Sequence, residues 1–509
     1  MKNMGMSNIA FKVFSICVMV NVGLGYSSRV FCQGDSRAGV AVRPNILFIV
    51  SEDNGPELGC YGAPVKTPNL DRLALNGLLF QRAFVAQAGC SQSRGAFLTG
   101  LYPHQNGQIG LATSHYAMYK PETPNVPRSL KAAGYRTGII GKVHVNPESA
   151  FPFDHMSSIQ GGNFQRKRMS QYAKEAGEFF KSSDGPFYLQ VNYPDAHAPF
   201  LRQVDGLPEK PLTADDVKPL PYMMVDSRSL RELTADYYNC LMRLDTYIGD
   251  LLEELRKSGK YDNTVVVYIG DHGADLLRGK RTSYEGGLRI PMIVSWPGKG
   301  PVGGSRTEMV STLDLYPTFL EIAGLPVPSY LSGRSLVPLI MGQKTDWRKY
   351  LFSEWHTHSN GNPYPQRAVR DERYKLIFNP ISGVENPGFA FTLKHNVVMS
   401  EEELYKGAGS EVRKSYQRMK NPPEFELYDL EKDPFEMVNL ADDKKHAKVL
   451  ERLRQTLFAW QKETRDPLVD RKKAKALFDM ILETGEEGKK AKQMVPYHEM
   501  MDPGMIFRN

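Results

Sequence analysis

Cys90 and Arg94 stand four residues apart in a segment that begins and ends in glycine, over 89–100. The spacing predicts a short helix that starts at Cys90 and carries Arg94 one turn further on. The start of a helix favours bound anions, because its unpaired backbone N–H groups point outwards. A cysteine at this place is a candidate nucleophile towards an anionic, oxygen-rich centre such as sulfate or phosphate.

Acidic residues follow two predicted strands that lie far apart in the chain, the apolar runs 45–50 and 264–269. Ligands of open α/β sheets bind beyond the carboxyl ends of the strands. Together with Cys90, the two clusters predict a cage for a hard divalent cation. Each carboxylate could instead cap a following helix or turn. The candidate metal ligands are Glu52, Asp53, Asp271 and His272.

Basic and proton-transferring residues follow further strands. Lys142 and His144 come after the run 137–140 and would face the same side if the extended backbone continued. His197 follows the run 187–192, and Lys280 lies in a glycine-flanked loop. Alone, each is more often a solvated lysine or a structural histidine. Their shared location after strands favours an active site.

The strands and helices that must position these residues alternate along the first two thirds of the chain, which predicts an α/β domain with a mostly parallel sheet between helices. Its expected strands are 45–50, 137–140, 187–192, 264–269 and 291–295, and its expected helices are 69–74, 165–181 and 230–257. After about residue 339 the strands become shorter, at 350–354, 366–371, 374–378 and 425–430, followed by a helix over 444–464. This change predicts a small antiparallel sheet with one covering helix.

Length and composition agree with two domains, one large and one small. The chain has 509 residues, of which 41% are hydrophobic and 24% charged, as in ordinary soluble globular proteins. The net charge is +7, and three of these positive charges belong to the first 33 residues, which leaves +4 for the rest. This modest charge does not favour nucleic-acid binding, which needs a concentrated basic patch.

The first 33 residues have the features of a signal peptide. Lys2 and Lys12 flank the start of an apolar run over 13–25 that is too short to span a bilayer permanently. A lipoprotein is less favoured, because the bulky Phe31 precedes Cys32. We therefore expect a secreted or periplasmic protein without stable membrane insertion.

Two cysteines outside the leader are not candidate nucleophiles. Cys60 and Cys240 could pair, since export would allow a disulfide. A buried thiol is the more common state of a free cysteine, so it is favoured for both.

The chemical segments together resemble the formylglycine-dependent sulfatases of the alkaline-phosphatase superfamily. The resemblance lies in 90–94, 141–144, 270–273 and 286–291. Within that family the chain is most similar to the heparan N-sulfatases (sulfamidases), through 98–107, 138–144, 151–154 and 460–467. The resemblance implies an alkaline-phosphatase-like fold with a small C-terminal α+β domain. The predicted parts are a signal peptide (1–33), a catalytic domain (44–340), an antiparallel-sheet domain (346–466) and a surface or mobile extension (467–509).

The resemblance also implies a nucleophile and a metal. A maturation enzyme would convert Cys90 to formylglycine, whose hydrate supplies the attacking oxygen and later expels the sulfate. A calcium ion would be held together with that hydrate by the four candidate ligands. Arg94 and Lys142 would neutralise hydrate and sulfate oxygens, while His144 orients or deprotonates the hydrate. His197, as general acid, and Lys280 would face the sulfate and the leaving group.

Two positions depart from the family pattern. Glu52 replaces an aspartate, and a flexible calcium site should tolerate the extra methylene. Gln92 stands where the family has proline, in the segment that the maturation enzyme reads before folding. We expect conversion of Cys90 nonetheless, because the rest of the site is intact. His358 and Arg367 resemble substrate contacts of sulfamidases and could bind a sugar or its carboxylate, or could instead pack the domain interface.

The favoured function is therefore a secreted sulfatase acting on N-sulfoglucosamine of heparan-type chains. One alternative is an O-sulfatase on another sulfated polysaccharide, and another is a phosphoester or phosphonate hydrolase of the same superfamily. A non-catalytic relative that binds sulfated glycans is the alternative if Cys90 is not converted. The sequence leaves exo or endo action open, and also whether the protein forms a homodimer.

Overall fold

The computed structural model describes residues 43–157, 159, 168–487 and 496–504. The predicted signal peptide, with Cys17 and Cys32, lies outside the described residues. Within the described part of the chain, none of the helices combines the length and the apolar character needed to cross a membrane. Cys60 and Cys240, which are both described, are free thiols there, as favoured. Cys240 is buried as expected, whereas Cys60 is only partly buried.

The larger sheet is mostly parallel, as predicted. Its order is β4-β3-β5-β1-β6-β7-β2-β8, with β9 paired to β2, and only the pairs β6–β7 and β2–β7 are antiparallel. The strands are β1 (Asn45–Ser51), β2 (Leu78–Phe84), β3 (Arg136–Ile140), β4 (His155–Met156), β5 (Phe187–Tyr193), β6 (Thr264–Gly270), β7 (Arg289–Ser295), β8 (Gly304–Arg306) and β9 (Val310–Ser311).

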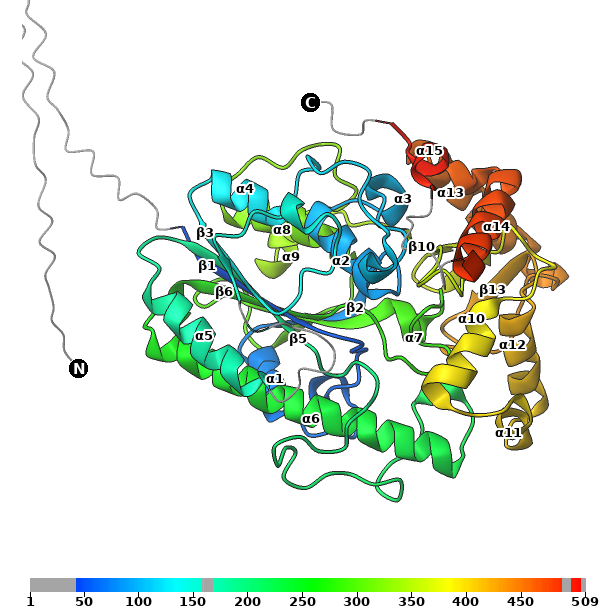
Figure 1. The fold of residues 1–509 in the computed structure, drawn as a ribbon, viewed down its shortest axis with the longest axis horizontal. Coiled ribbons are helices and arrows are strands. Elements are labelled where there is room, and N and C mark those ends of the chain that lie inside the picture. Colours follow the sequence, from blue (N-terminus) through cyan, green and yellow to red (C-terminus); the bar gives the residue numbers. More distant parts are fainter. Residues whose placement is uncertain (1–42, 158, 160–167, 488–495, 505–509) are drawn as a thin grey trace, which may run out of the picture. The chain divides into compact units, whose positions relative to one another are not determined.

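Helices cover both faces of this sheet (Figure 1). One layer comprises α1 (Pro68–Leu75), α5 (Ser170–Lys181) and α6 (Arg228–Lys257). The other comprises α2 (Cys90–Thr99), α4 (Val126–Ala132), α8 (Leu315–Ile322) and α9 (Val337–Ile340). Short helices α3 (Pro103–Asn106) and α7 (Glu285–Leu288) lie in connecting segments. The predicted helix 165–181 begins later, at Ser170, and residues 165–167 are not described.

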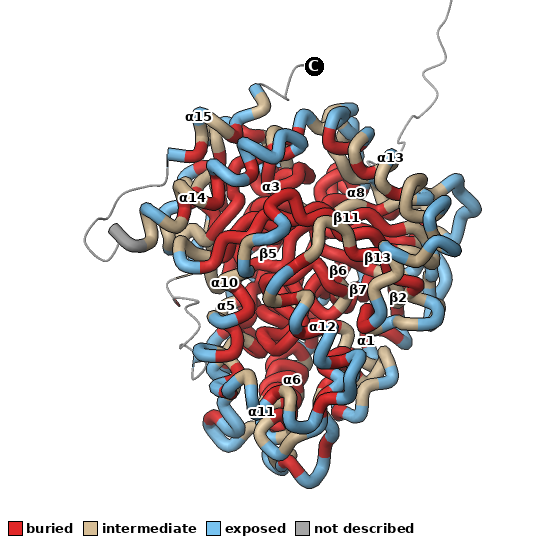
Figure 2. The backbone as a smooth tube through the Cα atoms, turned by 90° about the vertical axis from the view of Figure 1, so that its right-hand side faces the viewer, coloured by how far each residue is buried: buried red, intermediate tan, exposed pale blue. Residues whose placement is uncertain are grey.

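The central strand β1 shows why the sheet needs two helical layers. Its residues alternate between the faces, so Leu47 and Ile49 belong to the core beneath α5 and α6. Ile46, Phe48 and Val50 belong to the core on the other face. A strand buried on both sides has to be apolar throughout, which the run 45–50 satisfies. Figure 2 shows the central strands as buried backbone, with exposed residues on outer loops and helix surfaces.

The smaller sheet is antiparallel, in the order β10-β11-β12-β13. Its strands are β10 (Leu351–Trp355), β11 (Gln366–Arg370), β12 (Tyr374–Phe378) and β13 (Phe425–Asp429). The predicted covering helix is α13 (Ala447–Glu463), which packs on one face. The expectation of a single helix was wrong, because short helices between β12 and β13 cover the other face: α10 (Pro387–Thr392), α11 (Glu401–Lys406) and α12 (Ser410–Lys420).

The described parts of the tail after residue 466 pack against the rest of the protein rather than lying loosely on the surface. Helices α14 (Arg471–Glu487) and α15 (His498–Met501) contribute Leu477, Ile481 and Met501 to a core with Tyr116 and Trp355. These apolar residues lie among many lysines and glutamates, which suggested a surface or mobile segment. The domain boundaries at 340 and 346 stay a prediction.

Candidate active site

The sheet brings the two acidic clusters together. Strands β1 and β6 are parallel neighbours, and their last residues, Ser51 and Gly270, are partners in the register. The residues that follow therefore leave the same edge side by side, and the backbone N–H of Asp53 donates to Oδ1 of Asp271 at 2.9 Å. Asp53 adopts a left-handed φ of 50°, which turns the chain sharply after the strand.

Cys90 is the first residue of α2 and is buried beside these carboxylates. Its Sγ lies 3.3 Å from Nε2 of His272 and 3.9 Å from Oδ1 of Asp53. Burial by itself would raise the pKa of the Cys90 thiol. The positive charges of Lys280 and His272 outweigh burial and bring this pKa well below its usual value. The residue is thus placed and polarised as expected of a reactive centre.

Three cations surround the acidic cluster. Nζ of Lys280 lies 3.0 Å from both carboxylate oxygens of Asp53, and Nζ of Lys142 lies 2.7 Å from Oε1 of Glu52. The Arg94 guanidinium lies 3.1 Å from Oδ2 of Asp271 and 3.6 Å from Oε1 of Glu52. Burial opposes the charge of Asp271, but His272 and Arg94 keep the pKa of its carboxyl below the ordinary value.

A cavity of about 560 Å³ lies in front of Cys90. The basic residues that line it are Lys142, His144, His197 and His358. The chain after β3 does not continue extended, since Gly141 and His144 have φ of 91° and 59°. Lys142 and His144 nevertheless border the same cavity. Burial, followed by the charge of Lys142, brings the pKa of His144 well below 6.5, so its imidazole is neutral.

His197 is held between a backbone carbonyl and a lysine. Its Nδ1 lies 2.5 Å from the carbonyl oxygen of Ala198, so we assign the Nδ1–H to that contact. Its Nε2 lies 3.3 Å from Nζ of Lys280. Burial would lower the pKa of His197, but the charge of Asp53 overrides burial and raises this pKa above 6.5.

The described residues fit a hard cation. Glu52, Asp53 and Asp271 are fully buried, and three such carboxylates are unfavourable together without positive charge. Neither carboxylate oxygen of Glu52 accepts a hydrogen bond from any described residue, although Lys142 and Arg94 lie within ion-pair range. Cys90, Asp271 and His272 also offer ligand atoms within 4.8 Å of one another. Carboxylate oxygens are the ligands that calcium prefers, and the His272 imidazole lies beside them.

Two further polar residues belong to this site and were not expected. Asn192 accepts a hydrogen bond from Arg94 at 2.9 Å, and Asp275 lies 3.7 Å from Nζ of Lys280. Asn192 is the last residue but one of β5, so the strand-end rule that found the other residues could have found it. Asp275 lies four residues after Asp271, in the loop that follows β6, and no motif in the sequence singled it out.

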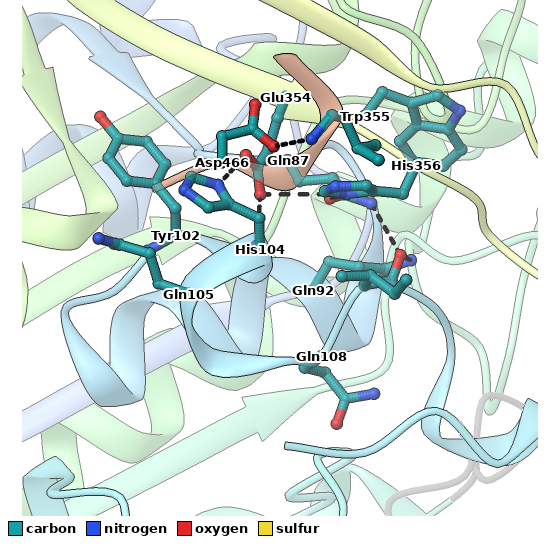
Figure 3. A network of polar contacts seen from close by, with 12 residues as sticks. Gln87, Gln92, Tyr102, His104, Gln105, Gln108, Glu354, Trp355, His356 and Asp466 are labelled. Atoms are coloured by element: carbon teal, nitrogen blue, oxygen red, sulfur yellow. Dashed lines mark hydrogen bonds and ion pairs between the residues drawn. The ribbon is translucent and has the colours of Figure 1, made fainter. Parts of the chain in front are cut away.

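Arg367 does not join the cavity. It is fully buried, and its guanidinium donates to both carboxylate oxygens of Asp466 at 2.7 and 2.8 Å. It also contacts Nε2 of His356 at 3.0 Å, and after burial itself this charge is the main cause that lowers the pKa of His356 to about 3. Figure 3 shows His356 and Asp466 within this network, near Glu354 and His104. The geometry supports the alternative left open for Arg367, packing between segments, and gives no support to substrate contact.

Replacing Arg367 with methionine should destabilise the protein by about 3–5 kcal/mol, because Asp466 would stay buried without its partner. Chemical denaturation of the variant measures this loss. Adding Asp466→Asn to the same chain should restore part of the stability. An unchanged free energy of unfolding together with a raised KM would instead show that Arg367 binds the substrate.

A second buried carboxyl, Glu57, makes stability depend on pH. Burial raises its pKa from 4.5 to about 7, with the Tyr237 hydroxyl partly opposing this shift. The folded protein therefore holds a proton that the unfolded chain releases, so stability falls as pH rises from 4.5 to about 7. Glu57→Gln should be more stable than wild type by up to about 3 kcal/mol at pH 8, with little difference near pH 4.5. Urea unfolding at both pH values checks this, and an equal difference at both would contradict it.

The sheet order and the cluster at its carboxyl edge define an enzyme of the alkaline-phosphatase-like class. The model of the family described as Sulfatase matches residues 44–325, more than half of the chain, and the chain belongs to this family. A second family model, described as N-sulphoglucosamine sulphohydrolase, C-terminal, matches residues 270–382. The expected family and enzyme class are thus confirmed.

Individual relatives cover most of the chain. Human N-sulphoglucosamine sulphohydrolase is 33% identical over 467 residues, which cover 84% of this chain and 91% of that protein. An ulvan-active sulfatase of Formosa agariphila is 30% identical over 463 residues, covering 86% and 87%. The phosphonate monoester hydrolase of Agrobacterium radiobacter shares the fold with a TM-score of 0.61 at 20% identity, covering 83% of this chain and 96% of that one.

Proposed function

We propose that this sulfatase releases sulfate from N-sulfoglucosamine of heparan-type glycans. The observation that carries the proposal is the burial of Cys90 at the start of α2, 3.3 Å from His272 and beside two carboxylates and Lys280. The similarity to human N-sulphoglucosamine sulphohydrolase, including the matching C-terminal family model, supports the choice of substrate.

Formylglycine made from Cys90 would supply the attacking hydrate oxygen, and calcium held by Glu52, Asp53, Asp271 and His272 would supply positive charge beside it. Arg94 and Lys142 lie within 3.6 Å of the carboxylates of this site and add fixed positive charge for an anionic substrate. Such preorganised charge stabilises the transferring group in the transition state.

The histidines of the site are the candidates for proton transfer. His144 is neutral and borders the cavity with Cys90, so it can orient the nucleophile or accept its proton. His197 has a raised pKa, as a general acid requires, and its Nε2 contacts Lys280. His197 would therefore protonate the leaving nitrogen, with Lys280 beside it. His358 borders the same cavity and is the remaining candidate for a sugar contact.

The basic and apolar start of the chain supports secretion or export to the periplasm, with the leader removed. An O-sulfated polysaccharide is the second candidate substrate, favoured by the similarity to an ulvan-active sulfatase over most of the chain.

A sulfate-release screen across defined sugars tests the proposal, on protein whose residue 90 has been identified by peptide mass spectrometry. N-sulfoglucosamine should release sulfate fastest, and a chelator should stop the release. Release only from O-sulfated sugars would favour the second candidate. Release of phosphate from phosphate monoesters, or of the alcohol from phosphonate monoesters, would favour the superfamily alternative. Unmodified cysteine in protein from the native host would overturn the formylglycine step.

A further inference from the structure

Gln92, the residue that departs from the family pattern, is fully buried and engaged in the folded protein. Its side-chain Nε2 donates to the carbonyl oxygen of Thr357 at 2.6 Å and lies 3.5 Å from that of Ile109. Gly89 allows this arrangement, since a Cβ there would lie 2.6 Å from Oε1 of Gln92. The amide thus connects the helix that carries Cys90 with two distant segments.

Gln87 contacts the same two carbonyl groups as Gln92. Its Nε2 lies 3.2 Å from the carbonyl oxygen of Ile109 and 3.5 Å from that of Thr357. Its Oε1 lies 2.9 Å from Nδ1 of His356, and this pair lies close to Gln92 in Figure 3. We refer to Gln87 and Gln92 as the glutamine clamp.

The two clamped segments lead directly into walls of the cavity in front of Cys90. Residues 111–113 follow Ile109, and His358 follows Thr357, and all of these line that cavity. The walls are joined to each other, since the N–H of Leu111 donates to the carbonyl oxygen of His358 at 2.9 Å. Ser91, next to Cys90, accepts from the N–H of Ala112 at 2.9 Å.

We propose that the glutamine clamp positions His358 and the 111–113 wall over Cys90 and thereby sets the fit of the sugar. Gln92 would then act in the folded enzyme as a positioning residue, in addition to standing in the segment read during maturation. A proline at 92 has no side-chain donor, so the Thr357 carbonyl would keep only the longer contact with Gln87. The inference rests on the proposed function for its substrate, but the clamp itself rests on these contacts.

The test uses Gln92→Met and Gln87→Met, which keep the length of the side chain and remove its amide. Kinetics on N-sulfoglucosamine are normalised to the formylglycine content of each preparation. Each variant should raise KM by roughly tenfold, as expected for the loss of one buried hydrogen bond, with kcat per aldehyde within about twofold. Gln455→Met, on the exposed face of α13, is the matched control and should change neither value.

Hydrogen exchange at the amide of Leu111 provides a readout that does not need turnover. Exchange of this amide should become faster in both clamp variants, because its hydrogen bond to the carbonyl oxygen of His358 joins the two walls of the cavity. An unchanged KM, or a loss confined to kcat, would overturn the proposal even if exchange became faster.

If wild type releases no sulfate, the proposed function fails, and the calorimetric affinity for N-sulfoglucosamine then replaces KM as the measured quantity. Equal affinity and equal exchange in the variants would then overturn the clamp separately. Gln92→Met could prevent maturation of Cys90. In that case Gln87→Met alone tests the glutamine clamp, because Gln87 lies outside the segment 90–94.

Discussion

Replacing Cys90 with alanine should lower kcat/KM for sulfate release by at least about 10⁴-fold, because the variant lacks any group that can become the nucleophile. The surroundings of residue 90 should stay intact, since Asp53 and His272, which contact its Sγ, have ion pairs of their own and alanine fits a helix start. Steady-state kinetics with N-sulfoglucosamine measure the loss, and circular dichroism checks that the variant is folded.

Cys60→Ala is the matched control for loss of a thiol. Burial raises the pKa of Cys60 to about 12, with the charge of Asp71 adding to the rise, so this thiol is inert at neutral pH. The control should keep full activity. Activity in Cys90→Ala within tenfold of wild type would exclude residue 90 as the nucleophile. Sulfatase activity and phosphonate hydrolase activity would then both require a different nucleophile.

The acidic half of the site could be predicted because it depends on a local rule. An apolar run long enough for a buried strand ends at a defined residue, and polar residues just beyond it reach the ligand edge of a parallel sheet. This rule located Asp53 after β1 and Asp271 after β6, and the register of Ser51 with Gly270 makes them neighbours. The sequence did not show that β1 and β6 are adjacent. That adjacency comes from sheet order, which hydrophobic patterns do not encode.

Arg367 shows where sequence reasoning fails. Its partner Asp466 lies 99 residues further on, in a segment that was expected to end the small domain. A buried arginine with a bidentate carboxylate has the same sequence appearance as one that binds a substrate carboxylate. Only the three-dimensional contact separates the two roles. The packing of Leu477 and Ile481 was missed for a related reason, because lysines and glutamates surround these apolar residues in the sequence of α14.

Gln92 illustrates the opposite case, in which the sequence posed the question and the structure supplied a physical context. In the sequence, the residue is a departure from a family pattern and bears only on maturation. In the fold, its amide donates to the carbonyl oxygen of Thr357, 265 residues away, in the loop just after β10 and next to His358. A motif position can thus carry a contact that depends on the tertiary structure, and such a contact is invisible to spacing.

Replacing Asp53 with asparagine should lower kcat/KM by roughly 10³-fold, the size expected when a preorganised electrostatic contact near the reacting group is lost. Asparagine keeps the shape of the side chain and tolerates the left-handed φ of 50°, so the loop after β1 should keep its course. The substitution removes one of the carboxylates proposed to hold calcium. It also removes the ion pair that holds Lys280 at 3.0 Å.

Thermal unfolding separates the metal role from a loss of activity alone. After chelation, calcium at 100 times its dissociation constant should stabilise wild type by about 2.7 kcal/mol, and Asp53→Asn should show little of this gain. Asp479→Asn, which changes an exposed carboxylate paired with Lys475 on α14, should keep the full gain. An equal calcium-dependent shift in wild type and Asp53→Asn would show that Asp53 does not hold the ion. In that case the main partner of Asp53 would be Lys280, and its negative charge would serve to orient that lysine beside His197.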